Sequence, residues 1–147
     1  MLYGPMTHPQ LLGALGRAGH SSKILITDGN YPASTGAPAT AERIYLNLAP
    51  GLLTVSDILE VLKRTMPIEQ AGIMVPAADV AEADRPASIP AHDEYRAALP
   101  GIEVVEIPRW DFYDVAKSDD VSVVIVSADQ RLYANLLLTV GVRQPGE

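Results

Sequence analysis

The sequence predicts an α/β fold, a three-layer sandwich in which helices flank a central, mostly parallel sheet. Short apolar runs such as residues 23–28 lack polar alternation, which is typical of strands buried on both faces. Segments with a helical spacing of apolar residues lie between these runs. The chain has 147 residues, of which 48% are hydrophobic and 20% charged, and this suits one packed core. We therefore expect a single domain over residues 1–147.

Caps, apolar periodicity and prolines delimit the expected elements. Thr7 is a favourable N-cap for the first helix, with Pro9 in its first turn. A second helix is capped near Thr54 and ends at Pro67. The other expected segments are a strand at 23–28, a loop at 29–38, a strand with one exposed face at 42–48, a strand at 71–77, an excursion at 78–90, a helix at 91–99, a strand at 102–107, a helical turn or two at 111–116, a strand at 121–126 and a final strand at 136–142.

The composition argues against several classes of protein. Acidic residues outnumber basic ones by 18 to 11, for a net charge of −7, so no basic surface for nucleic acid is expected. The lack of cysteine excludes disulfides, thiolate metal sites and cysteine nucleophiles, and three histidines leave little material for a zinc site. No apolar run approaches the roughly 20 residues of a membrane span, and no signal pattern is recognisable. We expect a cytoplasmic protein without metal, nucleic-acid or membrane partners.

Two polar motifs flank the first expected strand. Gly19-His20 lies just before it, where a histidine can favour the dipole of the preceding helix or can act as a proton shuttle near neutral pH. Asp28-Gly29-Asn30 lies just after it and forms either a simple turn or, at the carboxyl end of a buried strand, a ligand site. Each motif keeps both interpretations at this point.

Two further segments combine polar and aromatic side chains. Residues 109–113 (RWDFY) contain the only Trp, the only Phe and one of the six Tyr of the chain. Aromatic walls and the Arg109 guanidinium suit a sugar, whose ring has an apolar face and a rim of hydroxyls, but the same segment could anchor the core. Tyr133 and Asn135 are expected on the same side of an extended segment, either in a site or as a surface pair.

These motifs stand in one order through nearly the whole chain: Gly19-His20, residues 24–33 (ILITDGNYPA), residues 133–138 (YANLLL) and residues 140–142 (VGV). In sequence, order and spacing they resemble the D-ribose pyranase / L-fucose mutarotase family. Each motif is short, and the four in register carry the resemblance together.

The resemblance implies interconversion of the cyclic forms of a free monosaccharide by proton transfer alone, with no metal or cofactor. One group takes the proton of the anomeric hydroxyl while another protonates the ring oxygen, which gives the open-chain aldehyde before the ring closes again. By the same resemblance, His20 is the acid/base and Asp28 binds a sugar hydroxyl. Tyr133 and Asn135 stand where the family has its Tyr and Asn, and Tyr133 is a candidate proton partner for His20.

The family has a fucose branch and a ribose branch, and this chain carries features of both. Residues 109–113 are similar to the fucose mutarotases, in which an arginine precedes an aromatic residue, one further residue and Phe-Tyr. The run at 133–135 is similar to the ribose pyranases, and the fucose branch usually has an imidazole and Phe where Asn30 and Tyr31 stand. Because Arg109 would contact the sugar, we expect an L-fucose mutarotase, with a D-ribose pyranase as the alternative.

The spacing of His20 and Asp28 predicts a site shared between subunits. The strand between them spans about 20 Å, so both side chains reach one sugar only if Ser21-Ser22 folds back or two subunits share a pocket. The resemblance implies ring-shaped homo-oligomers, commonly decamers, with sites at subunit interfaces. We expect such a mixed site here.

Two alternatives to an isomerase belong to other functional classes. One is a non-catalytic sugar-binding or transport-accessory protein on the same fold, and the other is an interaction scaffold with a vestigial pocket. Loss of rate enhancement with retained sugar binding in His20→Ala is expected only for an enzyme.

Overall fold

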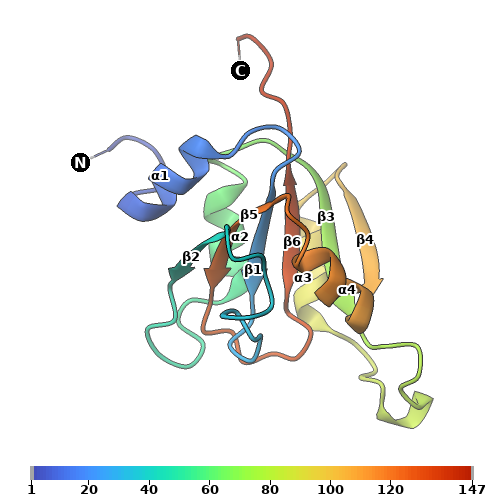
Figure 1. Cartoon of the computed structure of the whole chain (residues 1–147). Coiled ribbons are helices and arrows are strands. Elements are labelled where there is room, and N and C mark those ends of the chain that lie inside the picture. The colour runs from blue at the N-terminus through green and yellow to red at the C-terminus, as the bar shows by residue number, and fades with distance from the viewer. Residues whose placement is uncertain (1, 147) are drawn as a thin grey trace.

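A computed structural model describes residues 2–146 and contains one six-stranded sheet with helices packed against it (Figure 1). The observed elements follow the predicted order of helices and strands. They are α1 (Pro9–Arg17), β1 (Lys23–Thr27), β2 (Glu42–Tyr45), α2 (Val55–Leu62), β3 (Ile68–Val75), the short 3₁₀ helix η1 (Glu82–Asp84), α3 (Pro90–Ala98), β4 (Glu103–Pro108), α4 (Arg109–Ala116), β5 (Val121–Val126) and β6 (Leu136–Val140).

The sheet has the strand order β2-β5-β1-β6-β3-β4. The β2–β5, β1–β5 and β3–β4 pairs are parallel, whereas β6 runs antiparallel to both of its neighbours, β1 and β3. The predicted mostly parallel sheet is therefore confirmed. Because only β6 is reversed, its amino end lies at the same edge of the sheet as the carboxyl ends of the other five strands.

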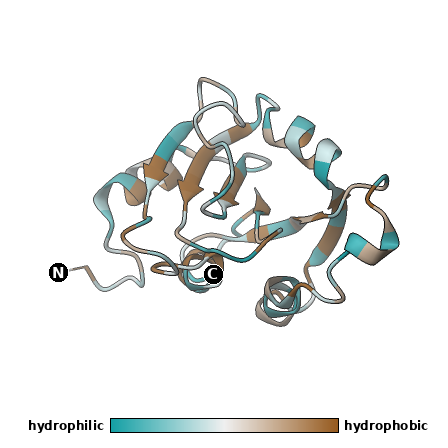
Figure 2. Cartoon of the chain, turned by 90° about the horizontal axis from the view of Figure 1, so that it is seen from below, coloured by the Kyte–Doolittle hydropathy of each residue, from teal (hydrophilic) through white to brown (hydrophobic). Residues whose placement is uncertain are grey.

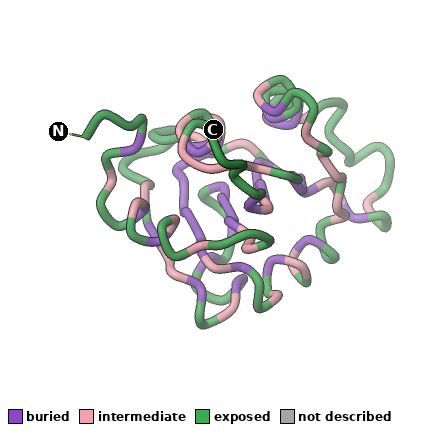
Figure 3. Tube along the Cα trace, turned by 90° about the horizontal axis from the view of Figure 1, so that it is seen from above, coloured by how far each residue is buried: buried purple, intermediate pink, exposed green. Residues whose placement is uncertain are grey.

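Both faces of the sheet are buried, as the unbroken apolar runs predict. In β1, Ile24 and Ile26 belong to a core that includes residues of α1, α2 and α3, whereas Leu25 points to a second core that includes Phe112 of α4 and Tyr31. Hydrophobic residues are concentrated on the strands in Figure 2, and the central strands are buried in Figure 3. Helices on both faces make the predicted three-layer sandwich.

Local capping explains where two of the helices begin. Thr54 accepts a hydrogen bond from Asp57 N (3.2 Å) while the Asp57 carboxylate accepts one from Thr54 N (2.9 Å), a capping box at the start of α2. The predicted N-cap of α1, Thr7, is wrong by one residue. His8 has extended backbone and its Nδ1 accepts from Leu11 N (3.2 Å), which leaves Pro9 at the first helical position.

Several predicted boundaries differ from the structure by two or three residues: the strand predicted at 71–77 is β3 at Ile68–Val75, and the final strand ends at Val140 instead of 142. The strand predicted at 42–48 ends at Tyr45, because its single neighbour β5 ends at Val126, the residue that pairs with Tyr45. Helix α4 begins at Arg109, two residues earlier than predicted, directly after β4. This early start places Arg109 in the first turn of the helix, at the edge where the strands end.

We predict that Leu138→Ala lowers the free energy of unfolding by about 2–5 kcal/mol, because Leu138 is fully buried in the central strand β6 and its loss leaves a cavity. Val142→Ala is the matched control: Val142 is 52% exposed just beyond the same strand and should change stability by no more than about 0.5 kcal/mol. Urea unfolding followed by circular dichroism measures both. Equal effects of the two variants would contradict the assigned core.

Candidate functional site

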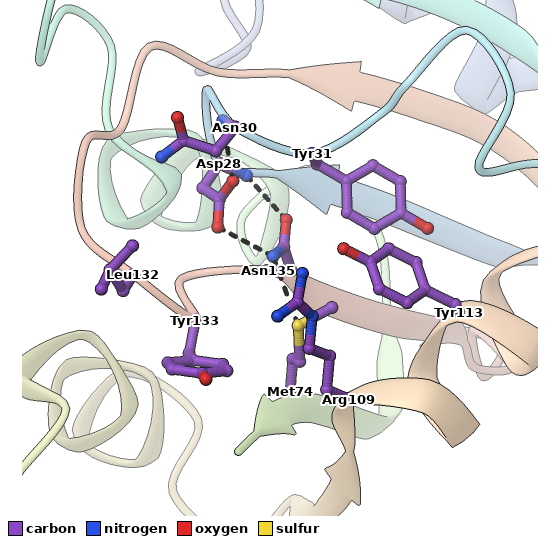
Figure 4. Close-up of a pocket in the computed structure, with 9 residues that line it drawn as sticks. All are labelled: Asp28, Asn30, Tyr31, Met74, Arg109, Tyr113, Leu132, Tyr133 and Asn135. Carbon is purple, nitrogen blue, oxygen red and sulfur yellow. Dashed lines mark hydrogen bonds between the residues drawn. The ribbon is translucent and has the colours of Figure 1, made fainter. Parts of the chain in front are cut away.

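A pocket of about 220 Å³ opens at the edge of the sheet where β1, β3 and β4 end and β6 begins (Figure 4). In α/β sheets, ligand sites form outside the carboxyl ends of the strands. Four of the five residues predicted for the site, Asp28, Arg109, Tyr133 and Asn135, line this pocket together. The remaining lining residues are Asn30, Tyr31, Met74, Tyr113 and Leu132.

Asp28 and Asn135 form a reciprocal pair at the base of the pocket (Figure 4). The Asp28 backbone N–H donates to Asn135 Oδ1 (2.8 Å), and Asn135 Nδ2 donates to Asp28 Oδ2 (2.8 Å). Asn30 N donates to the other carboxylate oxygen, Oδ1 (2.9 Å). The Asp28 backbone N–H needs an acceptor and the Asp28 carboxylate needs a donor. The Asn135 amide meets both needs in only one orientation, with its oxygen toward the N–H and its nitrogen toward the carboxylate. The pair joins the end of β1 to the start of β6.

The Asp28 carboxyl group is almost completely buried. Burial raises its pKa above the ordinary value, and the negative charge of Asp129 adds to that effect. Hydrogen bonds from the backbone of Asn30 and Tyr31 and from the Asn135 amide oppose the shift without cancelling it. Asp28 is thus a carboxyl group with raised proton affinity, held in a fixed orientation and able to accept a hydrogen bond from a hydroxyl.

Aromatic rings and a guanidinium form the side of the pocket nearest α4. The Tyr31 and Tyr113 rings are 5.4 Å apart between centroids, and Arg109 Cζ lies 5.8 Å from the Tyr113 ring centroid. Arg109 also lies over Trp110 (4.9 Å), whose side chain is exposed outside the pocket. Phe112 of the same segment is fully buried. Within residues 109–113, Phe112 thus belongs to the core, whereas Arg109 and Tyr113 line the pocket, and the role of this segment as a wall for a sugar stays a prediction.

The loop after β1 supplies Tyr31 and is held by Arg43 of β2. The Arg43 guanidinium donates to four backbone carbonyls within residues 33–41, at 2.8 to 3.2 Å. The Tyr31 hydroxyl donates to Gly36 O (2.6 Å), and burial raises the pKa of this phenol, which stays protonated. This loop is a rigid wall in which the Tyr31 hydroxyl already has its acceptor.

Tyr133 has a backbone φ of +61°, in the left-handed region, so the predicted extended geometry of residues 133–135 is wrong. A non-glycine residue in this region carries strain on the order of 1 kcal/mol or more. The structure stabilises it through its carbonyl, which lies 2.9 Å from His92 Nε2, while Tyr95 OH donates to the next carbonyl, Ala134 O (2.8 Å). Tyr133 and Asn135 nevertheless line the same pocket.

His20, the fifth predicted site residue, lies away from this pocket. It precedes β1, at the opposite end of the strand from Asp28, and its imidazole Nε2 is 2.9 Å from Glu69 Oε2. The His20 side chain is 53% exposed. Within one chain, Ser21-Ser22 does not fold back to bring His20 to the Asp28 side, so His20 does not line this pocket.

Several pocket residues escaped sequence analysis. Met74 lies at the end of an apolar strand and Leu132 in a loop, and neither carries a local signal of function. Asn30 belongs to the Asp28-Gly29-Asn30 motif already considered as a ligand site, and the position of Tyr31 directly after that motif is the signal that could have found it.

Over residues 2–146, no three His, Cys, Asp or Glu side chains are grouped to hold a metal ion. In the same part of the chain, the helices are too short or too polar to cross a lipid bilayer.

We predict that Asp28 titrates above its ordinary pKa of 3.8 in the folded protein. The folded state then binds this proton more tightly than the unfolded chain, so the contribution of Asp28 to stability is fully present below about pH 3.8 and is lost as the pH rises through the folded pKa. Carbon-13 NMR of the carboxyl carbon measures the pKa, and urea unfolding across the same pH range measures the change in stability. A titration midpoint at or below 3.8 would refute the prediction.

The matched variants for this titration are Asp28→Asn and Asp119→Asn. The first removes the carboxyl group from the pocket and should flatten the corresponding part of the stability profile. The second removes a carboxylate from the exposed loop before β5 and should leave that part unchanged.

Comparison with known proteins places this chain in a family. The family model described as the RbsD / FucU transport protein family matches residues 1–143. Human fucose mutarotase is 31% identical over 142 residues, which cover 91% of this chain and 88% of that protein. Bovine fucose mutarotase is also 31% identical, over 145 residues that cover 93% and 90% of the two chains.

Solved structures confirm the fold. Bacillus subtilis RbsD complexed with D-ribose superposes with a TM-score of 0.79 at 24% identity, over 98% of this chain and 99% of that one. The fucose mutarotase of Streptococcus pneumoniae in complex with L-fucose gives the same TM-score at 21% identity, over 98% of this chain and 100% of that one. The resemblance inferred from the four sequence motifs is confirmed, and the chain belongs to the RbsD / FucU transport protein family.

Proposed function

We propose that this protein is a cofactor-independent isomerase that interconverts the cyclic forms of a free monosaccharide, with L-fucose as the preferred sugar. One observation carries the proposal: a buried, oriented carboxyl–amide pair, Asp28 and Asn135, shares a small pocket with Arg109 and two tyrosine rings. A sugar ring presents hydroxyl groups and an apolar face. The acceptors, donors and apolar wall of this pocket match those features. The similarity to human and bovine fucose mutarotases supports the activity and the choice of sugar.

The reaction needs proton transfer only. A base takes the proton of the anomeric hydroxyl, the bond between the anomeric carbon and the ring oxygen breaks, and its electron pair goes to the ring oxygen, which an acid protonates. Rotation of the open-chain aldehyde and closure by the reverse steps give the other anomer, or the other ring size if a different hydroxyl attacks. No electrons leave the sugar, and the overall change is an isomerisation.

The pocket residues divide this task by their chemistry. Asp28 accepts a hydrogen bond from a sugar hydroxyl and Asn135 holds that carboxylate in place. The guanidinium of Arg109 donates to sugar oxygens at the opposite side, and the rings of Tyr31 and Tyr113 cover the apolar face of the sugar. Tyr133 supplies a phenol at the mouth of the pocket and is the proposed partner of His20 in proton transfer.

His20 enters the pocket of a neighbouring subunit in this proposal, and the protein forms ring-like homo-oligomers, with a decamer as the expected size. Two features support the assembly: His20 is exposed at the opposite edge of the sheet, and several large apolar side chains are exposed on the surface. One of these, Leu132, lies at the pocket itself. We also place the protein in the cytoplasm. The chain has no cysteine and therefore no disulfide that would require an oxidising compartment.

Two other functions have specific support. The Tyr133-Ala134-Asn135 run and the fold shared with RbsD complexed with D-ribose favour a D-ribose pyranase as the second candidate. Membership of a transport protein family favours a non-catalytic sugar-binding or transport-accessory role as the third.

We predict that the protein accelerates anomer exchange of L-fucose more than that of D-ribose, D-galactose or D-glucose, measured by saturation-transfer NMR. His20→Ala should abolish the acceleration while sugar binding persists, because the acid/base is lost and the pocket residues remain. His8→Asn is the matched control: it removes an imidazole but keeps a capping oxygen at the start of α1, so it should retain activity. Unchanged exchange for every sugar would refute the isomerase, and faster pyranose–furanose exchange of ribose would favour the pyranase.

We also predict that inactive His20→Ala and Asp28→Asn chains restore activity when they assemble together. In a random mixed oligomer about a quarter of the pockets combine an intact His20 with an intact Asp28, because each comes from a different chain. Co-expression with two affinity tags, tandem purification and saturation-transfer NMR provide the measurement. A fully active monomer, or mixed oligomers no more active than the single variants, would contradict a shared site.

A further inference from the structure

Helix α3 contacts the pocket loop without lining the pocket. Two of its buried side chains reach the backbone just before β6: His92 Nε2 lies 2.9 Å from Tyr133 O, and Tyr95 OH donates to Ala134 O at 2.8 Å. The next carbonyl, Asn135 O, accepts a longer bond from Met74 N of β3 (3.5 Å). Three successive carbonyls of the pocket segment thus each have a donor, and the donors come from α3 and β3.

The first of these contacts falls on the strained residue. Tyr133 combines a bulky side chain with a φ of +61°, a conformation that persists only where the surroundings impose it. The geometry of this one residue directs its phenol to the pocket and sets the path of the chain into Asn135, whose amide holds Asp28. A donor on the Tyr133 carbonyl therefore acts on the pocket from outside it.

We propose that His92 is a positioning residue for the sugar site: its Nε2–H holds the Tyr133 carbonyl and thereby fixes the Tyr133 phenol and the Asn135–Asp28 pair in the pocket. This inference rests on the proposed function, in which those three side chains act on a sugar. His92 itself does not line the pocket.

The chemistry of the contact defines the state of the imidazole. A carbonyl oxygen only accepts hydrogen bonds, so the proton of His92 must be on Nε2. Burial lowers the pKa of His92, which favours the neutral ring and therefore a single tautomer. The ring also lies near that of Tyr95, the other donor from α3, with 6.4 Å between centroids.

A third residue of α3 contacts the same loop farther from the pocket and supplies a control. Glu94 Oε1 accepts from Arg131 Nη1 (2.8 Å), and Arg131 in turn bonds to the buried carboxylate of Asp129. Loss of Glu94 weakens the attachment of α3 to the loop without touching a carbonyl of residues 133–135. Glu94→Ala therefore separates a general loosening of α3 from the specific effect of the His92 bond.

NMR of the full-length protein tests the positioning directly. In a long-range proton–nitrogen spectrum, His92 should give the Nε2–H tautomer at neutral pH. His92→Leu should shift the backbone carbon resonances of Tyr133 and the side-chain amide of Asn135. His92→Gln keeps an N–H donor the same number of bonds from Cα and should restore both toward the native values. The Nδ1–H tautomer, or unmoved Tyr133 and Asn135 resonances in His92→Leu, would overturn the inference, whatever the activity of the protein.

Sugar-exchange kinetics provide the second arm. His92→Leu should reduce kcat/KM between about 10- and 100-fold, mainly through kcat, as expected when a catalytic group is misplaced, with substantial recovery in His92→Gln and native values in Glu94→Ala. Equal kinetics of His92→Leu and the native protein would overturn the role of His92 but leave the proposed function intact. Absence of exchange in the native protein would overturn the proposed function, and the NMR arm then decides the role of His92.

If His92→Leu fails to fold, Tyr95→Phe takes its place. This variant keeps the buried ring and removes only the hydroxyl that bonds to Ala134 O, so it should shift the Asn135 amide resonance and reduce kcat/KM by a smaller factor. Native resonances and native kinetics in Tyr95→Phe would overturn the view that α3 positions the pocket.

Discussion

The reversed direction of one strand determines which residues meet at the pocket. In an all-parallel sheet, only the carboxyl ends of strands would meet at the pocket edge. Because β6 lies antiparallel between β1 and β3, its amino end joins them, and Asn135 meets Asp28 across the β1–β6 ladder. The side-chain amide of Asn135, at the start of β6, donates to the carboxylate of Asp28, at the end of β1. The same pair therefore joins two central strands of the sheet and lines the pocket.

This pocket concentrates features that are individually unfavourable for folding. A buried carboxyl with a raised pKa and a bulky residue at positive φ both cost stability, yet both residues line the same pocket. Each depends on hydrogen bonds from its surroundings: Asn30 N and Asn135 Nδ2, both of pocket residues, donate to the carboxylate. His92 of α3, which does not line the pocket, contacts the Tyr133 carbonyl. Such a distribution is expected where the geometry of a few polar groups matters more than local stability.

The sequence predicted the architecture well because its signals are local. Unbroken apolar runs marked β1 and β5, and the capping pair around Thr54 marked α2. Four of five predicted site residues converge because each follows or precedes a strand at the same edge. Three features have no local signal: the reversal of β6, the left-handed backbone of Tyr133, and the contribution of Met74, all of which depend on contacts between segments distant in the chain. His92 could not be found either, since a lone histidine on a short helix does not show which carbonyl it will meet.

Placement of His20 on the far edge of the sheet links catalysis to assembly in the proposed function. Each chain then carries two incomplete halves of a site, a pocket at one edge and an imidazole at the other, with the length of β1 between them. An open row of such chains would leave an unfilled pocket at one end and an unused histidine at the other, whereas a closed ring completes every pocket. The rigidity of the strand that separates Asp28 from His20 is thus the physical reason why a closed assembly, rather than a flexible loop, would bring the two groups to one sugar.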